Sequence, residues 1–506
     1  MTVLTSCLWA TRPSSLSRRT NAIAHLRNLA TVPSTNTVTS SFPYDQHFQG
    51  LVDQKKSDQS YRYFRNINRL AREFPYAVTP DGNTKIDVWC SNDVLGMGGH
   101  PAVIKKMHAV LDQHGACSGG SRNIAGHNQH AVALEEALAH LHSKQAALYF
   151  NSGYLANLGA LTVLGSHLPG CVILSDELNH ASLIDGIRNS KADKVIWRHN
   201  DVQDLEAKLA ALPRHVPKII AFESVYSMCG TIAPVAEICD LAERYGAITF
   251  VDEVHALGLY GPRGAGIAEH LDATLQLTGQ PRGSILDRVH IVSGGLGKGI
   301  GGMGGYIAGP TALVDVVRSF ARGFIFTTSQ PPSVMAGAKK SIEVLSQTPN
   351  TRRQLHHNVI SVKRLLREHG LPVLPNQSHI VPLMIGDAEK SRQVADILFN
   401  EYRIYAQPIN APSVAIGAER LRIAPTSSHT PAQQKHLLQA LKEIWGRLGL
   451  RTLQEWERDS EGRLKPEWNP EQSQPLWTET TLEAEPLNAA LLPSVERTLE
   501  DTRVGV

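Results

Sequence analysis

Short apolar runs alternate with helical segments between residues 146 and 292, and this alternation restricts the possible fold more than any other feature. The six predicted strands are residues 146–150, 171–175, 194–197, 218–223, 247–251 and 289–292, with helical segments such as 232–245 between them. Regular alternation is typical of an α/β domain whose mostly parallel sheet is covered by helices on both faces. In such sheets, ligands bind at the carboxyl ends of the strands.

Two of the predicted strands end next to residues that suit one kind of cofactor chemistry. Lys298 follows the last run within a glycine-rich segment, where glycines let cofactor and substrate approach the backbone closely. Asp252 ends the run at 247–251, and an aspartate there can keep a pyridinium nitrogen protonated. His180 and His255 follow neighbouring strand ends. Lysine and aspartate in this order indicate pyridoxal phosphate chemistry, although a solvated lysine and buried structural histidines are the simpler alternatives.

A further strand end has the features of a phosphate-binding position. Asn151 to Tyr154 follow the run at 146–150 and open a helix, so the amides of Gly153 and Tyr154 are free to bind an anion. Ser175 and Ser224 end two other runs. We therefore expect the cofactor and substrate to bind at this edge of the sheet.

Composition excludes several other classes of protein. The 506 residues carry a formal net charge of only +3 and show no lysine-rich face or zinc-finger spacing, which argues against a nucleic-acid partner. No metal site is predicted. No apolar run reaches the ~18 residues of a membrane span. The six cysteines contain no CxxC pair, as expected in a reducing compartment.

The N-terminal segment differs in composition from the rest of the chain. Residues 1–44 contain no Asp or Glu but carry Arg12, Arg18, Arg19 and Arg27 among Ser, Thr, Ala and Leu. This composition is typical of a mitochondrial transit peptide, with a disordered tail as the alternative. The segment predicts import into the mitochondrial matrix.

The remaining chain predicts four further parts. Residues 45–100 form an N-terminal helix and strand segment, with one helix spanning Asp45 to Phe74, and residues 101–330 form the large cofactor-binding domain opened by a helix at 101–114. Residues 331–447 suggest a small α+β domain with helices at 333–347, 351–369 and 430–446 and a strand at 380–385. Residues 448–506 have little periodicity and read as an irregular extension.

Seven ordered motifs resemble those of one enzyme family, the α-oxoamine synthases, which have the fold type I architecture of pyridoxal phosphate enzymes. The motifs begin at Asn92, Gly119, Asn179, Glu223, Val251, Leu296 and Gly323. The branch that condenses glycine with succinyl-CoA to 5-aminolevulinate is similar in additional segments, including Val88 to Asp93, Arg198 to Asp201 and Gln407 to Asn410. The resemblance runs from about residue 45 to 447. It implies the first step of tetrapyrrole and haem synthesis.

The resemblance also implies a role for individual residues. Lys298 would bind the cofactor covalently and transfer the Cα proton, Asp252 would pair with the ring nitrogen, His255 would bond the phenolic oxygen, and His180 would stack on the ring. Gly153, Tyr154 and Ser224 would bind the cofactor, together with Thr327 and Thr328 of a second subunit in a homodimer with shared active sites. Asn92 and Arg422 would hold the glycine carboxylate. Succinyl-CoA and its distal carboxylate would be recognised by residues that include Arg62, Ser121, Asn123 and Ser175.

Several positions depart from the family pattern. Val94 replaces a tyrosine, Gly295 a threonine, Cys229 an aspartate and Ala131 a histidine. Two alternatives therefore remain at this point. One is an α-oxoamine synthase with another amino acid or acyl-CoA, and the other is a catalytically silent partner of an active paralogue, although such a partner would be expected to lose Lys298.

Overall fold

The computed structural model describes residues 42–61, 63–277, 284–459 and 476–477. The predicted transit peptide, the predicted site residue Arg62 and most of the C-terminal extension lie outside this part of the chain. Contacts divide the chain into two compact units, residues 1–61 and 62–506, which are described separately.

The described part of the first unit is the single helix α2, Tyr44–Ser57, whose residues are all exposed. The predicted helix from Asp45 to Phe74 was wrong in its second half. Gln59 adopts a left-handed backbone conformation with φ of 59°, and the Ser60 N–H bonds Asp58 Oδ1 at 2.9 Å. This local turn competes with the helix and ends it.

The second unit is built on a seven-stranded sheet in the order β4-β10-β9-β8-β7-β5-β6. Its strands are β4 (Ala146–Phe150), β5 (Val172–Asp176), β6 (Asp193–Trp197), β7 (Lys218–Glu223), β8 (Ile248–Asp252), β9 (Ile291–Gly295) and β10 (Gly305–Gly309). Strands β9, β8, β7, β5 and β6 run parallel, whereas β10 is antiparallel to both of its neighbours. The predicted mostly parallel sheet is confirmed, and β10 is the strand that the sequence analysis missed.

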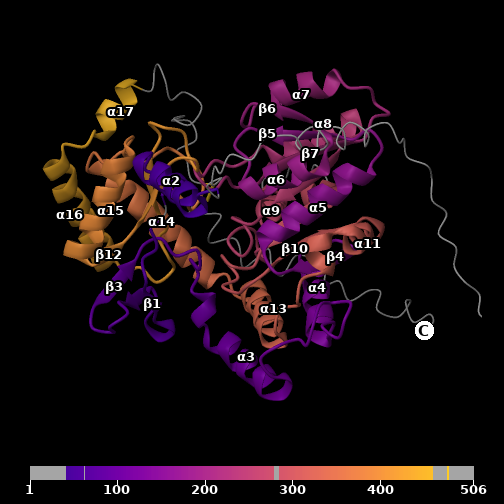
Figure 1. Cartoon of the computed structure of the whole chain (residues 1–506), viewed down its shortest axis with the longest axis horizontal. Helices are drawn as coiled ribbons and strands as arrows, with labels where there is room; N and C mark the ends of the chain where they lie inside the picture. Colours follow the sequence, from indigo (N-terminus) through magenta and orange to yellow (C-terminus); the bar gives the residue numbers. More distant parts are fainter. Residues whose placement is uncertain (1–41, 62, 278–283, 460–475, 478–506) are drawn as a thin grey trace, which may run out of the picture. The chain divides into compact units, whose positions relative to one another are not determined.

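Helices cover both faces of this sheet (Figure 1). Alternate residues of β7 show this, since Ile219 and Ala221 belong to one apolar cluster and Ile220 and Phe222 to the other. One face packs against α5 (Gly153–His167), α6 (Ala181–Ser190), α11 (Thr311–Phe320) and α12 (Arg322–Ile325). The opposite face packs against α4 (Gln129–Leu141), α7 (Val202–Ala210), α8 (Val235–Tyr245), α9 (Ile267–Leu277) and α10 (Ile285–Arg288).

Two smaller sheets and a group of helices complete the second unit. The sheets have the orders β1-β2-β3-β12 and β11-β14-β13. Their strands are β1 (Asn68–Arg69), β2 (Tyr76–Val78), β3 (Lys85–Val88), β11 (Val381–Met384), β12 (Ile404–Tyr405), β13 (Gln407–Ile409) and β14 (Arg420–Ile423). The helices are α3 (Pro101–His114), α13 (Pro332–Gln347), α14 (Asn350–Glu368), α15 (Ala388–Tyr402), α16 (Pro431–Leu448) and α17 (Leu453–Asp459), with short 3-10 turns at Ala71–Glu73 and Met97–Gly99.

The helix α17 lies in the stretch that the sequence analysis read as irregular. Trp477 of the same stretch is buried and stacks on His356 with ring centroids 3.6 Å apart. Among the described helices, none is both long enough and apolar enough to cross a membrane.

Candidate active site

Three predicted site residues form a line at the carboxyl end of the central sheet. Lys298 lies in the loop after β9, His255 follows β8, and Arg422 lies on β14. Lys298 Nζ is 2.9 Å from His255 Nε2, and Arg422 Nη2 is 3.4 Å from His255 Nδ1. A guanidinium can only donate, so His255 Nδ1 accepts from Arg422 and its Nε2–H points at Lys298. This order of hydrogen bonds favours a neutral lysine amine that accepts.

The electrostatics of the line agree with its hydrogen bonds. Burial and the two cations hold the pKa of His255 well below its usual value. Burial and Arg422 lower the pKa of Lys298 to about 8, against the opposing charges of Asp252 and Glu223. An amine with this pKa is roughly a tenth neutral at pH 7, about two hundred times more than an ordinary lysine. Lys298 is therefore prepared to act as a nucleophile or base.

Asp252 is connected to His180 through two residues that the sequence analysis missed. Asp252 ends β8, is buried, and accepts hydrogen bonds from Val254 N at 2.8 Å and from Asn157 Nδ2 at 2.6 Å. Asn157 Nδ2 also donates to Ser182 Oγ at 3.0 Å, and Ser182 Oγ lies 2.8 Å from His180 Nδ1. One signal was present in the sequence, because Asn157 stands between the apolar residues Leu155, Ala156 and Leu158 in the segment that forms α5.

Burial raises the pKa of Asp252 above its usual value, and the bonds from Val254 and Asn157 and the charge of Lys298 offset only part of this rise. These three effects favour the carboxylate, which is the form that can hold a proton on a neighbouring ring nitrogen. His180 also caps α6, since its Nδ1 accepts from Ser182 N at 3.2 Å. Its ring orientation is therefore fixed by the same residues that fix Asp252.

The N-terminus of α5 fits the predicted phosphate-binding position. Ser152 caps the helix through Leu155 N, and the first-turn amides of Gly153 and Tyr154 precede the first helical hydrogen bond. Asn157, the partner of Asp252, lies one turn further on, about 6 Å along the axis. A Cβ on Gly153 would come within 3.4 Å of Gly295 Cα, so this surface is narrow. A flat ring that carries a phosphate at one end and a basic nitrogen at the other fits this spacing, as pyridoxal phosphate requires.

Two buried residues, Ser224 and Glu223, lie beside Asp252, and Ser224 does not have the cofactor-binding position that was predicted for it. The Ser224 hydroxyl donates to Glu253 and lies 3.3 Å from the Asp252 carbonyl, so it is not directed at a ligand. Glu223 pairs with Asp252 in the β7–β8 register, and its Oε1 has no hydrogen-bond partner among the described residues. Burial and the charge of Asp252 raise the pKa of Glu223 well above its usual value. The sequence analysis did not place Glu223 in the site.

Of the other predicted residues, one lies beside Lys298, several lie near the N-terminus of α5, and one is buried. Asn92 Oδ1 accepts from Arg422 Nη1 at 3.4 Å and thus belongs with Lys298. Ser121 forms an isolated β-bridge with Thr328, whose carbonyl accepts from Asn151 Nδ2 at 2.8 Å. Thr327, next along the chain, is half-buried, and Asn123 is exposed. Ser175 is buried and accepts from Asn179 Nδ2, so its hydroxyl is held inside the protein.

Two spaces share Asn92 and Arg422 in their lining, and Lys298 lines the smaller of them. The inner one holds about 10 Å³ and is lined by residues that include Val94, His255, Leu259, Lys298 and Arg422. The outer cleft, about 460 Å³, is lined by residues that include Arg69, Cys90, Asn92, Gly297 and Arg422. Asn92 and Arg422 line both, which places them where a substrate entering the cleft reaches the lysine.

The fold and this site define a class that the comparisons identify. The aminotransferase class I and II family matches residues 84–441. A serine palmitoyltransferase from S. paucimobilis with a bound PLP–myriocin aldimine is similar in structure, with a TM-score of 0.71 and 29% identity over 80% of this chain and 98% of that one. The chain thus has the architecture of the class I and II aminotransferases.

Proteins of similar sequence identify the family within this class. The mitochondrial 5-aminolevulinate synthase of Neurospora crassa is 53% identical over 88% of this chain and 70% of its own length. The mitochondrial 5-aminolevulinate synthase of Schizosaccharomyces pombe is 52% identical over 83% of this chain and 74% of its own length. The chain belongs to the 5-aminolevulinate synthase family.

Proposed function

We propose that the chain is a mitochondrial, pyridoxal-phosphate-dependent 5-aminolevulinate synthase, an acyltransferase of haem synthesis. It condenses glycine with succinyl-CoA and releases 5-aminolevulinate, CoA and carbon dioxide. The line Lys298–His255–Arg422 beside the buried Asp252 is the observation that carries this proposal. The two relatives described above, both named mitochondrial 5-aminolevulinate synthase, and the acid-free N-terminal segment support it.

One group of residues in the site holds the cofactor. Pyridoxal phosphate, when bound, supplies an electron sink for negative charge at the amino-acid Cα. The N-terminal amides of α5 bind its phosphate, and Asp252 holds a proton on its ring nitrogen. His180 would stack on the cofactor ring, and His255 would hydrogen-bond its phenolic oxygen.

The substrate is held by a separate pair of side chains. Arg422 and Asn92 bind the glycine carboxylate, and this orients one Cα–H bond toward Lys298. The Nζ of Lys298, uncharged, takes this proton and returns one to the same carbon after carbon dioxide has left. Ser121, Asn123 and Arg62 are assigned to the distal carboxylate of succinyl-CoA.

The proposed homodimer rests on an exposed apolar surface beside the cofactor position. Phe326 and Ile124 are 79% and 73% exposed, and they flank the bridge between Ser121 and Thr328. Contiguous exposed apolar surface is a feature of protein–protein interaction sites. A second copy that covers them would bring Thr327 and Thr328 to the partner's active site, so each site would be shared.

The test is the absorption spectrum of purified protein with pyridoxal phosphate, followed by glycine and then succinyl-CoA. We expect a cofactor band that responds to glycine, and a colorimetric aminoketone product after succinyl-CoA. Lys298→Ala should lose both, while Lys105→Ala, a control on the exposed face of α3, should keep both. A cofactor band that does not respond to glycine or succinyl-CoA would indicate that the enzyme uses a different amino acid or acyl-CoA as substrate. The absence of any band would favour the silent-partner alternative.

A further inference from the structure

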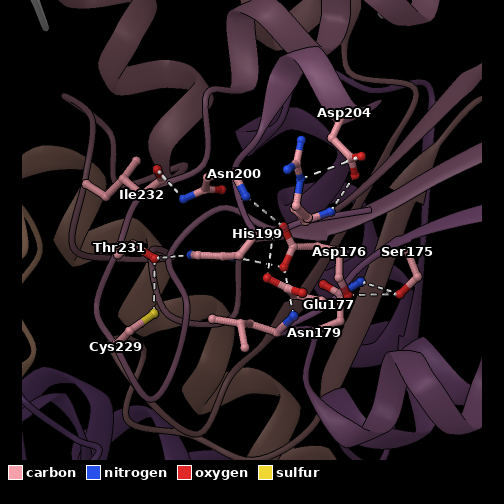
Figure 2. Close-up of polar contacts among 12 residues, drawn as sticks. Ser175, Asp176, Glu177, Asn179, His199, Asn200, Asp204, Cys229, Thr231 and Ile232 are labelled. Carbon is pink, nitrogen blue, oxygen red and sulfur yellow. Dashed lines mark hydrogen bonds and ion pairs between the residues drawn. The ribbon is translucent and has the colours of Figure 1, made fainter. Parts of the chain in front are cut away.

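Three loops at the carboxyl edge of the central sheet meet at one buried histidine (Figure 2). His199 follows β6, and its side chain is only 4% exposed. Its Nδ1 lies 2.9 Å from Asp176 Oδ1 at the end of β5, and its Nε2 lies 2.7 Å from Thr231 Oγ1 in the loop after β7. His199 belongs to the segment Arg198 to Asp201 that resembles the family, but no contact with cofactor or substrate was predicted for it.

The hydrogen bonds around His199 define its protonation. Asp176 is a buried acceptor, so His199 Nδ1 carries a proton, and Asp176 and Cys229 together raise the pKa of His199 to about 10 in spite of burial. As an imidazolium, His199 also donates from Nε2 to Thr231 Oγ1. The Thr231 hydroxyl hydrogen is then left for Cys229 Sγ at 3.0 Å. Tyr226 completes the enclosure, with its ring edge-on to His199 at a centroid distance of 4.3 Å.

One end of this network fixes the loop that carries His180. Asp176 Oδ1 also accepts from Leu178 N at 2.8 Å, and Asp176 Oδ2 accepts from Asn200 N at 3.1 Å. Asn179 next along the chain donates to Ser175 Oγ at 2.9 Å and to the Ala221 carbonyl at 2.8 Å. The direction in which His180 leaves this loop is therefore set by the contact of Leu178 with Asp176 and by those of Asn179 with Ser175 and Ala221.

The other end fixes the loop after β7. Tyr226 N bonds the Thr231 carbonyl at 3.0 Å, and Val225 and Ile232 form a β-bridge, so the loop is a narrow turn closed at Thr231. The Arg420 guanidinium donates to the Met228 carbonyl at the tip of this turn at 3.2 Å. Arg420 is two residues from Arg422 on β14. His199 thus links the loop of His180 to the turn that meets the strand of Arg422.

We propose that His199 is a positioning residue of the active site, which holds the loop of His180 and the turn at 224–233 in one arrangement through Asp176 and Thr231. This inference rests on the proposed function only in the choice of reaction. Because a misplacement of about 1 Å can cost about a hundredfold in rate, loss of this link should act on turnover rather than on substrate binding.

Three variants test the proposal. His199→Phe removes both hydrogen bonds, His199→Gln can replace one of them, and Thr231→Val removes only the contact to the turn. His215→Gln is the matched control, since His215 is exposed. Hydrogen–deuterium exchange is measured on the protein without cofactor, and kcat and KM are measured with cofactor, glycine and succinyl-CoA.

We expect His199→Phe to increase exchange at least threefold in peptides covering 177–183 and 226–233, and Thr231→Val in 226–233 alone. We expect kcat to fall ten- to a hundredfold in His199→Phe, with KM for both substrates changed less than threefold and partial recovery in His199→Gln. If His199→Phe does not fold, the other two variants decide by the same two measurements. Unchanged exchange and kcat in folded variants, or an effect on KM alone, would overturn the proposal. If the wild type makes no 5-aminolevulinate, the proposed function fails, but the exchange result still decides whether His199 links the two loops.

Discussion

The charge of Arg422 should control the reactivity of Lys298, and this can be measured without either substrate. The two cationic groups contact opposite nitrogens of His255, at 2.9 and 3.4 Å. The two ring nitrogens of His255 are about 2 Å apart, so Lys298 Nζ and Arg422 Nη2 are at most roughly 8.5 Å apart. At an effective dielectric constant of 20, this separation corresponds to a repulsion of about 2 kcal/mol between the two charges. After allowance for the partial exposure of Lys298, we expect about 1 pKa unit of this to be realised.

Arg422→Gln removes that repulsion, so the pKa of Lys298 should rise from about 8 to about 9. The neutral fraction of the amine at pH 7 would then fall about tenfold. The assay is the rate at which the apoprotein captures pyridoxal phosphate covalently, measured at saturating cofactor between pH 6 and 10.5. The variant should be about tenfold slower at pH 7 and equal to the wild type above pH 10.

Two variants separate charge from geometry in this experiment. Arg422→Lys keeps a cation and should leave the midpoint of the pH profile within about 0.3 units of the wild type. Asn92→Ala removes the other partner of the Arg422 guanidinium without changing the charge, and it should also leave the midpoint in place. A midpoint in Arg422→Gln that is unchanged, or that moves to lower pH, would refute the electrostatic reasoning.

Three further predictions follow from the contacts described above. Asn157→Leu leaves a buried carboxylate at Asp252 with one hydrogen bond fewer, so the free energy of unfolding should fall by about 1–3 kcal/mol in urea titrations. The pKa of His199 is raised by folding, so its contribution to stability is complete below about pH 6.5 and is lost as the pH rises through about 10. The difference in unfolding free energy between wild type and His199→Gln should therefore be about 3–5 kcal/mol at pH 6 and shrink steadily toward pH 10; a difference that grows with pH would contradict this sign. Phe326→Asp should convert the proposed dimer to monomer in light scattering and reduce cofactor affinity, whereas Phe320→Asp, at an exposed position on α11, should do neither.

The sequence was sufficient to predict the central sheet because its parallel strands are buried on both faces and read as continuous apolar runs. It was insufficient for β10, where Gly305 and Gly309 make the segment look like a loop. The structure explains the first of these glycines, since a Cβ at Gly305 would come within 2.3 Å of Gly153 N. A strand that must approach the cofactor-binding helix this closely loses the side-chain pattern by which strands are predicted.

The candidate site divides in the same way. Lys298, Asp252 and His255 stand at strand ends, and their position in the sequence already indicates where they lie in space. Asn157 and Ser182 lie inside two helices, and their role arises only because those helices pack side by side and Asn157 reaches Asp252 at the end of β8. Periodicity identifies the buried face of a helix, but it does not identify which polar residue on that face meets a carboxylate from another strand.

Three of the four departures from the family pattern, at Gly295, Val94 and Cys229, are accommodated by the surrounding packing, which argues against a silent partner. A Cβ at Gly295 would lie 3.2 Å from Val254 Cγ1, so Val254 occupies space that a threonine side chain would need. Val94 is buried, and the space left beside it and Lys298 holds only about 10 Å³, about one water molecule rather than a missing phenol. Cys229 closes the His199 network through Thr231. A chain that had lost catalysis would not be expected to keep packed side chains at these positions around a lysine whose pKa is lowered for reaction.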